Sequence, residues 1–444
     1  MLRYLMLSNW KSIYDPIEFS MNSTNERRHG ERLARVGRSR LLPVAAIYGA
    51  NAAGKSALVE GLAVLQVLVT ERRSKGDPLP VVPHKLKGKG EATSFGVEFV
   101  VAAPNDSPGR RRDWVFYYEL TADRHQIHRE SLMRLRSKDE EVLFEREGNR
   151  VEFFGDLEED LTSMAIKRLL TSNQTVLGFL GDLGDGPKLI DQAWRWFSEQ
   201  LKIIGPRSNF IMLPARIAAD ELFADAMNHG LSAADTGISK IDLEDLPVGA
   251  VLPPNKVQEI EDRLSVDNET LVLYGQYGEY GLLSLDASGS LRAQRLVTVH
   301  ESEPGADGES KERFTLTLSE ESDGTARFMH LLPMLFQLAE GSSRGVFIVD
   351  ELENSMHPLL TEKLVRAFLD GLNADDRRQL VFTTHELRLM QIPLLRRDEM
   401  WLADKLNGQT RLARMSEYSR KGVRKDADIL GLYTSGRLGG VPRI

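Results

Sequence analysis

Residues 44–65 read VAAIYGANAAGKSALVEGLAVL, an apolar run followed by a glycine-rich loop and an apolar helical pattern. The segment predicts a buried strand, a loop from Gly49 to Ser56 with the spacing G-x-x-x-x-G-K-S, and a helix. The two glycines let the backbone curl so that successive N–H groups point at one anion, and the positive end of the helix adds to that field. The segment is therefore typical of a loop that binds the phosphates of a nucleoside triphosphate.

The loop also supplies side chains suited to phosphate and metal. Lys55 is expected to reach the β- and γ-phosphates, and the Ser56 hydroxyl is expected to ligate Mg²⁺. ATP and Mg²⁺ are thus the predicted cofactors. Nucleotide contacts are expected at Gly49, Asn51, Ala52, Ala53, Gly54, Lys55, Ser56 and Ala57.

The composition is that of an ordinary globular chain. Its 444 residues correspond to about two to four domains. The absence of cysteine excludes disulfides, thiolate metal sites and cysteine nucleophiles. No apolar run approaches the ~20 residues of a membrane span, and the N-terminus lacks the marks of a signal peptide. We therefore expect a cytoplasmic protein that does not contact the membrane.

Two stretches gather arginine although the net charge is −8. An acidic chain has no global attraction to nucleic acid. Solvated loops are the expected interpretation of both stretches, and local contact with nucleic acid or nucleotide is the alternative. The stretches contain Arg27, Arg28, Arg32, Arg35, Arg38 and Arg40 in one case and Arg110, Arg111 and Arg112 in the other.

Other segments give a coarser outline of the chain. The opening residues are expected to form an edge strand, residues 93–150 to be β-rich with a turn at 104–109, and residues 157–231 to be helical. Trp194, Trp196 and Phe197 are expected in the core, with a base-stacking surface as the alternative.

The C-terminal third adds two carboxylates at the end of a strand. Residues 346–351 read VFIVDE, a buried parallel strand followed by Asp350 and Glu351. Asp350 is placed to hold Mg²⁺, usually through water. Glu351 is placed to polarise the attacking water as a general base.

A second apolar strand, residues 380–384, ends at His385. A histidine at a strand end is usually a satisfied polar residue. This one follows the acid-tipped strand by one helix, expected over residues 359–372. The spacing predicts that His385 senses the γ-phosphate from the neighbouring strand.

The loop Ser319–Thr325 precedes a helical stretch from Ala326 to Leu338. Ser322 and Gly324 at the start of this helix predict a second anion site, with an ordinary helix cap as the alternative. The chain would then carry two half-sites for phosphate. If these cannot meet within one molecule, two chains should dimerise head to tail with ATP between them.

Taken together, these motifs resemble the ABC class of ATPases. The start of the chain, Leu7–Ile13, resembles the first strand of the branch that contains the structural-maintenance, Rad50 and RecF proteins. More closely, the chain is similar to stand-alone ATPases of the RloA type, relatives of the overcoming-lysogenisation-defect nucleases, which include the ATPase subunit of PARIS-type anti-phage systems. The corresponding motifs are Walker A at Gly49–Ser56, a signature-like Ser322–Thr325, Walker B at Phe347–Glu351, a D-loop at Ser355–Pro358 and the switch histidine His385.

The resemblance implies an α/β fold: an ABC-type P-loop NTPase head with mixed and parallel sheet, flanking helices and a largely helical insertion. The expected parts are lobe I with a β-hairpin arm (1–156), the insertion with dimer or partner contacts (157–250) and lobe II (251–444). It also implies slow ATP hydrolysis by a homodimer, or a higher homo-oligomer, with ATP sandwiched between heads.

Two positions depart from the ABC pattern. Asp323 stands where the general signature has glycine, which places a negative charge beside a phosphate site. The glutamine that links the lobes and contacts the metal has no clear counterpart. Gln174 is the candidate, with an ordinary polar loop residue as the alternative.

Relatives with nuclease activity carry a Toprim domain after the ATPase, whereas only residues 386–444 follow the switch histidine here. We therefore expect a Toprim-type nuclease or toxin on a separate polypeptide, with this chain as sensor or scaffold of an anti-phage, abortive-infection system. Asp426 and Asp428 are not expected to hold a metal. The alternative is a RecF/Rad50-like DNA-binding ATPase in DNA repair, which would use the same motifs and makes DNA a possible partner.

Overall fold

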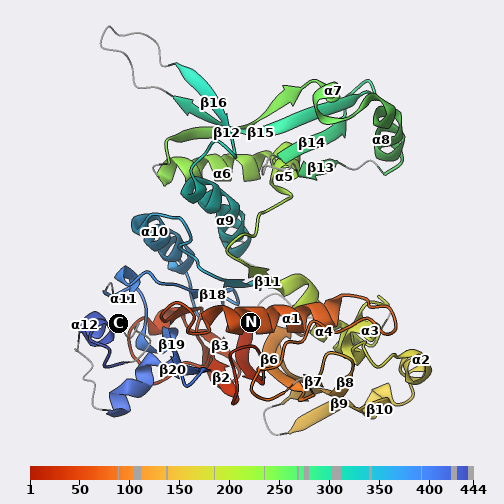
Figure 1. Ribbon diagram of the computed structural model, residues 1–444, viewed down its shortest axis with the longest axis vertical. Helices are drawn as coiled ribbons and strands as arrows, with labels where there is room; N and C mark the ends of the chain where they lie inside the picture. Colours follow the sequence, from red (N-terminus) through yellow and green to blue (C-terminus); the bar gives the residue numbers. More distant parts are fainter. Residues whose placement is uncertain are drawn as a thin grey trace. The chain divides into compact units, whose positions relative to one another are not determined.

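The computed structural model divides into two compact units, each formed by separate stretches of the chain (Figure 1). Unit 1 comprises Met1–Pro206, Gly341–Leu352 and Phe368–Ile444, and unit 2 comprises Arg207–Glu340 and Glu353–Ala367. The structure describes residues 1–88, 90–103, 112–136, 139–184, 186–234, 236–267, 270–274, 280–301, 312–339, 343–391, 393–421 and 428–438. The turn expected at 104–109, Arg110, Arg111 and Asp426 lie outside these residues.

Unit 1 contains a mostly parallel central sheet with the strand order β11-β17-β18-β5-β19-β20. Its last pair, β19 and β20, is antiparallel. Strands β5, β17 and β18 are buried along their whole length, as expected of strands covered on both faces. The three apolar runs found in the sequence are thus confirmed as neighbouring strands. The bounds are β11 Leu201–Ile204, β17 Val346–Val349, β18 Gln379–Thr383, β5 Val44–Tyr48, β19 Met400–Leu406 and β20 Gln409–Arg414.

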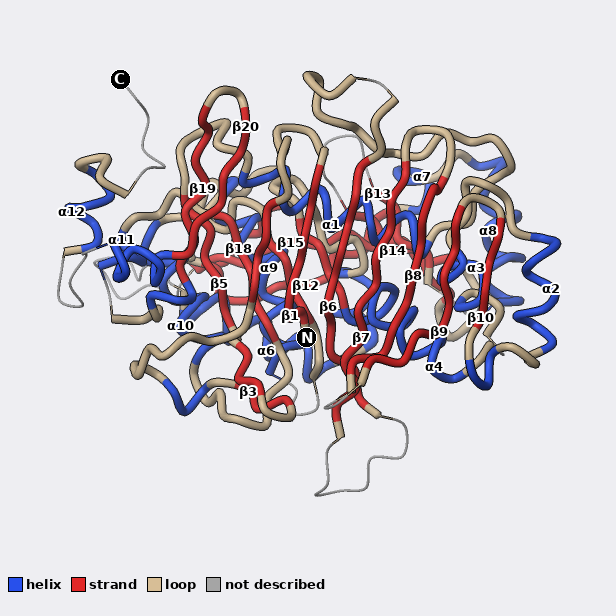
Figure 2. The backbone as a smooth tube through the Cα atoms, turned by 90° about the horizontal axis from the view of Figure 1, so that it is seen from below, coloured by secondary structure: helices blue, strands red, loops and turns tan. Residues whose placement is uncertain are grey.

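A second, antiparallel sheet in unit 1 has the order β10-β9-β8-β7-β6-β1-β2, and Figure 2 shows β6 to β10 running side by side. The expectation of an edge strand at the start of the chain is wrong, because β1 pairs with both β2 and β6. The bounds are β1 Leu2–Ser8, β2 Ile17–Ser20, β6 Thr93–Ala102, β7 Asp113–Ala122, β8 Ile127–Leu135, β9 Glu140–Glu147 and β10 Arg150–Phe153. A separate hairpin joins β3 (Ala34–Val36) to β4 (Ser39–Leu41).

Helix α1 (Lys55–Thr70) shares one hydrophobic core with both sheets of unit 1. In this core the Trp196 ring stacks on Phe99 with centroids 4.5 Å apart, and Phe197 meets Phe99 at 5.4 Å. Trp196 and Phe197 are fully buried, which confirms the core interpretation over a base-stacking surface. The further helices of unit 1 are α2 Leu161–Leu169, α3 Val176–Gly181, α4 Lys188–Arg195, α11 Arg388–Gln391 and α12 Ile429–Thr434.

The segment expected as an insertion, residues 157–250, is mostly helical but contributes to both units. Its strand β11 pairs in parallel with β17, so this part belongs to the central sheet. The boundary between the units falls at Arg207 instead of at 157 or 250. Short apolar runs such as Leu201–Ile204 cannot be assigned to strand or helix by periodicity alone, which explains the difference.

Unit 2 combines a sheet of order β12-β15-β14-β13, with β16 paired to β15, and several helices. Helix α9 packs against α6, where the Phe223 and Phe336 rings meet edge to face at 5.9 Å. Across the described part of the chain, no helix is long and apolar enough to cross a membrane. The bounds are α5 Leu213–Ala219, α6 Glu221–Ala233, β12 Ile238–Leu246, α7 Val248–Val251, α8 Pro254–Asp267, β13 Leu271–Tyr274, β14 Tyr280–Leu285, β15 Leu291–Glu301, β16 Arg313–Thr317, α9 Asp323–Ala339 and α10 Pro358–Leu369, whose last two residues are assigned to unit 1.

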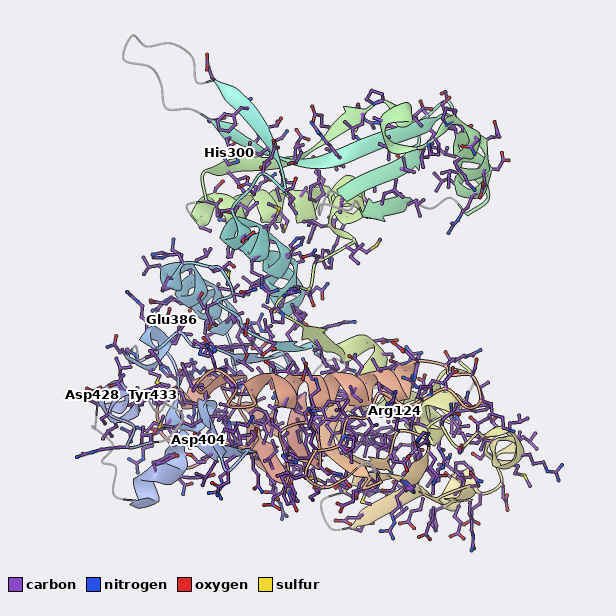
Figure 3. All side chains as sticks on the ribbon, in the orientation of Figure 1. Arg124, His300, Glu386, Asp404, Asp428 and Tyr433 are labelled. Atoms are coloured by element: carbon purple, nitrogen blue, oxygen red, sulfur yellow. The ribbon has the colours of Figure 1, made fainter. Side chains whose placement is uncertain are left out.

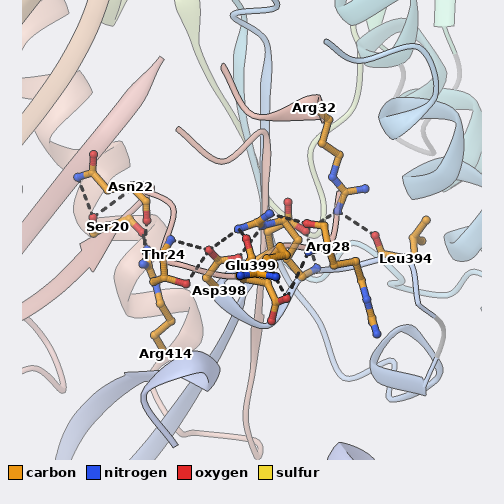
Figure 4. Close-up of polar contacts among 12 residues, drawn as sticks. Ser20, Asn22, Thr24, Arg28, Arg32, Leu394, Asp398, Glu399 and Arg414 are labelled. Carbon is orange, nitrogen blue, oxygen red and sulfur yellow. Dashed lines mark hydrogen bonds and ion pairs between the residues drawn. The ribbon is translucent and has the colours of Figure 1, made fainter. Parts of the chain in front are cut away.

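A buried ionic network in unit 1 ties residues 20–32 to the segment that leads into β19 (Figure 4). Arg396 Nε donates to Asp398 Oδ1 at 2.8 Å, and both side chains are fully buried. The Thr24 amide donates to Asp398 Oδ2 at 2.7 Å. Burial raises the pKa of Asp398, but the bonds from Arg396 and Thr24 outweigh burial and hold that pKa below its ordinary value.

Replacing Asp398 with asparagine is expected to destabilise unit 1 by about 3 kcal/mol, because Arg396 would keep its buried charge without a counter-charge. Urea unfolding near neutral pH measures this loss. The exposed acid Glu159, replaced with glutamine, is the matched control. The wild-type advantage should shrink as the pH falls below about 4, since the stabilisation exists only while Asp398 is ionised. Equal unfolding midpoints for the two variants would contradict this account.

Candidate nucleotide site

The parallel strands of the central sheet bring the predicted residues to one edge. Strand β18 lies between β17 and β5, and all three run in the same direction. Their carboxyl ends therefore meet, and these ends are where ligands bind in open α/β sheets. Asp350 and Glu351 follow β17, His385 follows β18, and the loop beginning at Gly49 follows β5.

The loop after β5 has the backbone shape of an anion cradle. Ala52 and Gly54 adopt left-handed conformations, with φ of 63° and 102°, and Gly54 caps the start of α1. Such turns direct successive N–H groups toward one point in front of the helix. Asn51 and Ala52 are exposed at this loop, Ala53 is buried, and Ser56 and Ala57 lie in the first turn of α1.

The Lys55 ammonium lies over its own loop. Its Nζ donates to the carbonyl oxygens of Gly49 at 2.8 Å and Ala50 at 3.2 Å, and to His385 Nε2 at 2.9 Å. An ammonium can only donate, so the His385 ring accepts at Nε2 and is neutral. His385 is exposed, whereas Lys55 is buried. The structure thus brings the histidine predicted to be the switch into contact with the lysine predicted to bind phosphate.

Thr383, the last residue of β18, organises the two acids. Its hydroxyl donates to Asp350 Oδ1 at 2.5 Å and accepts from the Glu351 amide at 2.7 Å. Glu351 adopts a left-handed conformation with φ of 50°, which is costly for a residue with a side chain and is typical of functional sites. Sequence reasoning missed Thr383; the polar residue at the end of a buried strand was the available signal.

Both glycines of the loop are also required by neighbouring strands. A Cβ on Gly49 would lie 2.4 Å from the Ala403 carbonyl oxygen of β19, and one on Gly54 would lie 2.0 Å from Thr410 Oγ1 of β20. The Thr410 hydroxyl donates to the Ala53 carbonyl at 3.0 Å and bonds to Ser12 Oγ at 2.7 Å. Residues far apart in the sequence therefore fix the loop from outside.

The donor set fits a nucleoside triphosphate with Mg²⁺. The loop and the helix start offer N–H groups, Lys55 a cation, Ser56 a hydroxyl and Asp350 an oriented carboxylate, all at one edge of the sheet. Hydroxyl and carboxylate oxygens are the ligands that Mg²⁺ accepts.

The structure separates Gln174 from this site. Its Oε1 accepts from Thr171 Oγ1 at 3.0 Å, and its Nε2 donates to the Arg73 carbonyl at 3.1 Å. Arg73 follows the C-terminal end of α1, whereas Lys55 starts that helix, and its 16 residues span about 24 Å. The assignment of Gln174 as a metal ligand is therefore wrong, and the loop alternative holds.

Asp428 also has a structural partner. Its carboxylate accepts from the Gly431 amide at 3.0 Å and caps helix α12, near Tyr433 (Figure 3).

The signature-like loop belongs to unit 2. Ser322 Oγ accepts from the Thr325 amide at 3.1 Å and caps α9, whose exposed first residue is Asp323. A Cβ on Gly324 would lie 2.4 Å from the Ser355 carbonyl oxygen, so this loop closely approaches the D-loop segment of the same unit. The two motifs are brought together there, in a different unit from the loop after β5.

Glu321, just before Ser322, is held by the sheet of unit 2. Its Oε1 accepts from Thr298 Oγ1 at 2.5 Å and lies 2.8 Å from His300 Nε2, both on β15, where Figure 3 labels His300. These bonds anchor the start of α9 to the sheet, an arrangement that local sequence patterns did not reveal.

The chain was also compared with known proteins. A structure titled "SMC head domain from Thermotoga maritima" is 12% identical over 93% of this chain and 98% of that chain, with a TM-score of 0.34. "Crystal structure of the SmcHead bound to the C-winged helix domain of ScpA" is 12% identical over 93% and 97%, with a TM-score of 0.39. Both likenesses are distant. No match was found among curated proteins. A family model matches residues 44–391, and the chain belongs to that family, described as "AAA domain, putative AbiEii toxin, Type IV TA system".

Proposed function

We propose that this protein is an ATP-binding and ATP-hydrolysing subunit of an anti-phage, abortive-infection system that controls a separate effector. The observation that carries the ATPase part is the convergence of Lys55, Asp350, Glu351 and His385 at one edge of the central sheet. The family description, which names a toxin of a type IV system, supports the defence role.

Each residue of this edge has a task in hydrolysis. Lys55 moves from the Gly49 carbonyl to phosphate oxygens, exchanging a neutral acceptor for a charged one. Ser56 and Asp350 would hold Mg²⁺, which would supply positive charge against the phosphates. Glu351 accepts a proton from the attacking water at a carboxylate oxygen. His385, released when Lys55 moves, donates a hydrogen bond to the γ-phosphate.

A second copy of the chain completes the site. Ser322 caps helix α9 of unit 2, a helix of 17 residues, and Gly324 lies in its first turn, so the start of this helix can bind an anion. The two half-sites belong to different units of one chain. Head-to-tail pairing of two chains would place each α9 start on the phosphates held by the partner, which makes ATP part of the dimer interface.

Replacing Lys55 with alanine is expected to abolish ATP binding, because the loop loses its phosphate-binding cation. Isothermal titration calorimetry with ATP and Mg²⁺ measures the affinity. Lys188, an exposed lysine at the start of α4, replaced with alanine, is the control and should bind like wild type. Unchanged affinity in the Lys55 variant would refute the site.

Complementation tests the shared site. Lys55→Ala and Ser322→Arg are each expected to be inactive alone, whereas an equimolar mixture should recover about a quarter of the wild-type ATPase rate, since half the dimers are mixed and each has one intact site. The neighbouring Ser319→Arg, also exposed, is the control and should hydrolyse ATP by itself. No recovery, although mixed dimers are present, would mean that the half-sites are not shared.

Co-purification from the native locus tests the effector. Glu351→Gln should bind ATP, hydrolyse it slowly and keep the ATP state, so a stoichiometric Toprim-type nuclease or toxin should accompany it or the wild type. Lys55→Ala is the comparison for ATP-dependent association. Recovery of DNA and replication factors alone would instead support a RecF/Rad50-like repair ATPase, whose motifs are the same.

A further inference from the structure

The hairpin β3–β4 presents three arginines from a firmly held base. Its inward residues Ala34, Val36 and Leu41 pack in a small core with Met1 and Val100. The alternation of strand residues then turns Arg35 and Arg40 outward, where both are exposed. These two residues lie directly opposite each other in the register, and the exposed Arg38 follows in the turn.

This arrangement costs free energy in the isolated protein. Like charges directly opposite on paired strands repel. Among the described residues, no carboxylate forms an ion pair with Arg35, Arg38 or Arg40. Some exposed arginines of unit 1 do have a counter-charge, since Arg129 pairs with Glu147 and Arg195 with Asp191. An uncompensated cationic hairpin in a chain of net charge −8 suggests an anionic ligand.

Two hollows flank the hairpin, and Arg38 lines both. The larger, of about 1150 Å³, is also lined by Arg3, Arg35, Arg112 and Arg136, and all its cations are arginines. Its lining carboxylates are Asp113 and Asp375, while Arg3 pairs with Glu98 and Arg136 with Glu141. The smaller, of about 930 Å³, is lined by Arg27 and Arg40, by one carboxylate, Glu26, and by polar residues such as Ser23 and Asn25. The two hollows form one basic, hydrogen-bonding surface on unit 1, the arginine surface.

The floor of the larger hollow is preorganised. Arg377 donates to Asp113 Oδ2 at 2.8 Å and to the Arg35 carbonyl at 2.7 Å, so it fixes the backbone of β3. Arg344 donates to the same carboxylate at 3.0 Å. A ligand that binds here meets arginines on a backbone that is already ordered.

The arginine surface is separate from the nucleotide site. Arg377 and Asp375 precede β18, whereas His385 follows it. The five residues of β18 span about 16 Å, so the surface and the site lie at opposite edges of the central sheet. ATP bound at the loop after β5 cannot neutralise these arginines.

We propose that the arginine surface binds the phosphodiester backbone of a nucleic acid. Guanidinium groups bind phosphate through two parallel hydrogen bonds, which favours arginine for this role. Several cations spread over two hollows match a ligand with repeated phosphates better than a single phosphate. This interpretation replaces the solvated-loop expectation for Arg35, Arg38 and Arg40, and it goes beyond the proposed function because it requires neither a particular effector nor ATP hydrolysis.

Fluorescence anisotropy with labelled duplex DNA, single-stranded DNA and RNA tests the proposal on the full-length protein. The triple variant Arg35→Gln, Arg38→Gln, Arg40→Gln should bind at least about tenfold more weakly at low salt. For the duplex, the plot of log affinity against log salt concentration has a negative slope, and the variant should make this slope less negative by about 2 to 3. The variant should melt no lower than wild type, because it removes a repulsive pair. Its ATP affinity should be unchanged, which separates this test from that of the nucleotide site.

A charge-matched control carries Arg129→Gln, Arg150→Gln and Arg195→Gln, three exposed arginines that pair with carboxylates. It should bind nucleic acid like wild type. An equal loss in the control, or no salt-dependent binding by the wild type, would overturn the proposal. Competition by polyglutamate as strong as that by nucleic acid would also overturn it and would point to an acidic protein ligand. The comparison of the three probes identifies the type of nucleic acid.

Discussion

The pairing of β18 with both β17 and β5 is the constraint on which the site depends. It sets three carboxyl strand ends side by side, so that Thr383 reaches Asp350 and the Glu351 amide while His385 reaches Lys55. These contacts turn three separate sequence motifs into one constellation. The burial of all three strands makes their order costly to change, and this order keeps the side chains of the candidate site in place without requiring a ligand.

The sequence predicted the features that depend on residues close together in the chain. An apolar strand, a glycine-rich loop and a helix start were sufficient to place Lys55, and apolar strands ending in polar residues placed Asp350 and His385. Contacts between distant segments were not predictable in this way: Thr410 lies more than 350 positions from the Ala53 carbonyl that it binds. Gln174 was predicted to lie at the nucleotide site but does not, because a loop sequence alone does not reveal at which end of α1 the loop packs.

In the arginine-rich stretch at residues 27–40, neighbouring arginines have different structural roles that the composition does not distinguish. Arg32 is buried and paired with Glu399 at 2.6 Å, whereas Arg35 and Arg40, a few residues later, alternate outward on a hairpin. Burial raises the pKa of Glu399 to about 7 despite the charge of Arg32. One cluster therefore combines a structural ion pair with an exposed cationic surface. Arg32 ends a short helical turn at Gly30–Arg32, whereas Arg35 and Arg40 lie on β3 and β4, and the sequence gives weak signals for such short elements.

The central claim is that unit 1 of one chain binds ATP and that the start of α9 in a second chain completes this binding site. Sedimentation velocity of Glu351→Gln, with ATP and Mg²⁺ and again with ADP, tests it most directly. The account predicts a monomer of 49.9 kDa with ADP and a species of twice that mass with ATP. A monomer that remains a monomer when saturated with ATP would contradict the account.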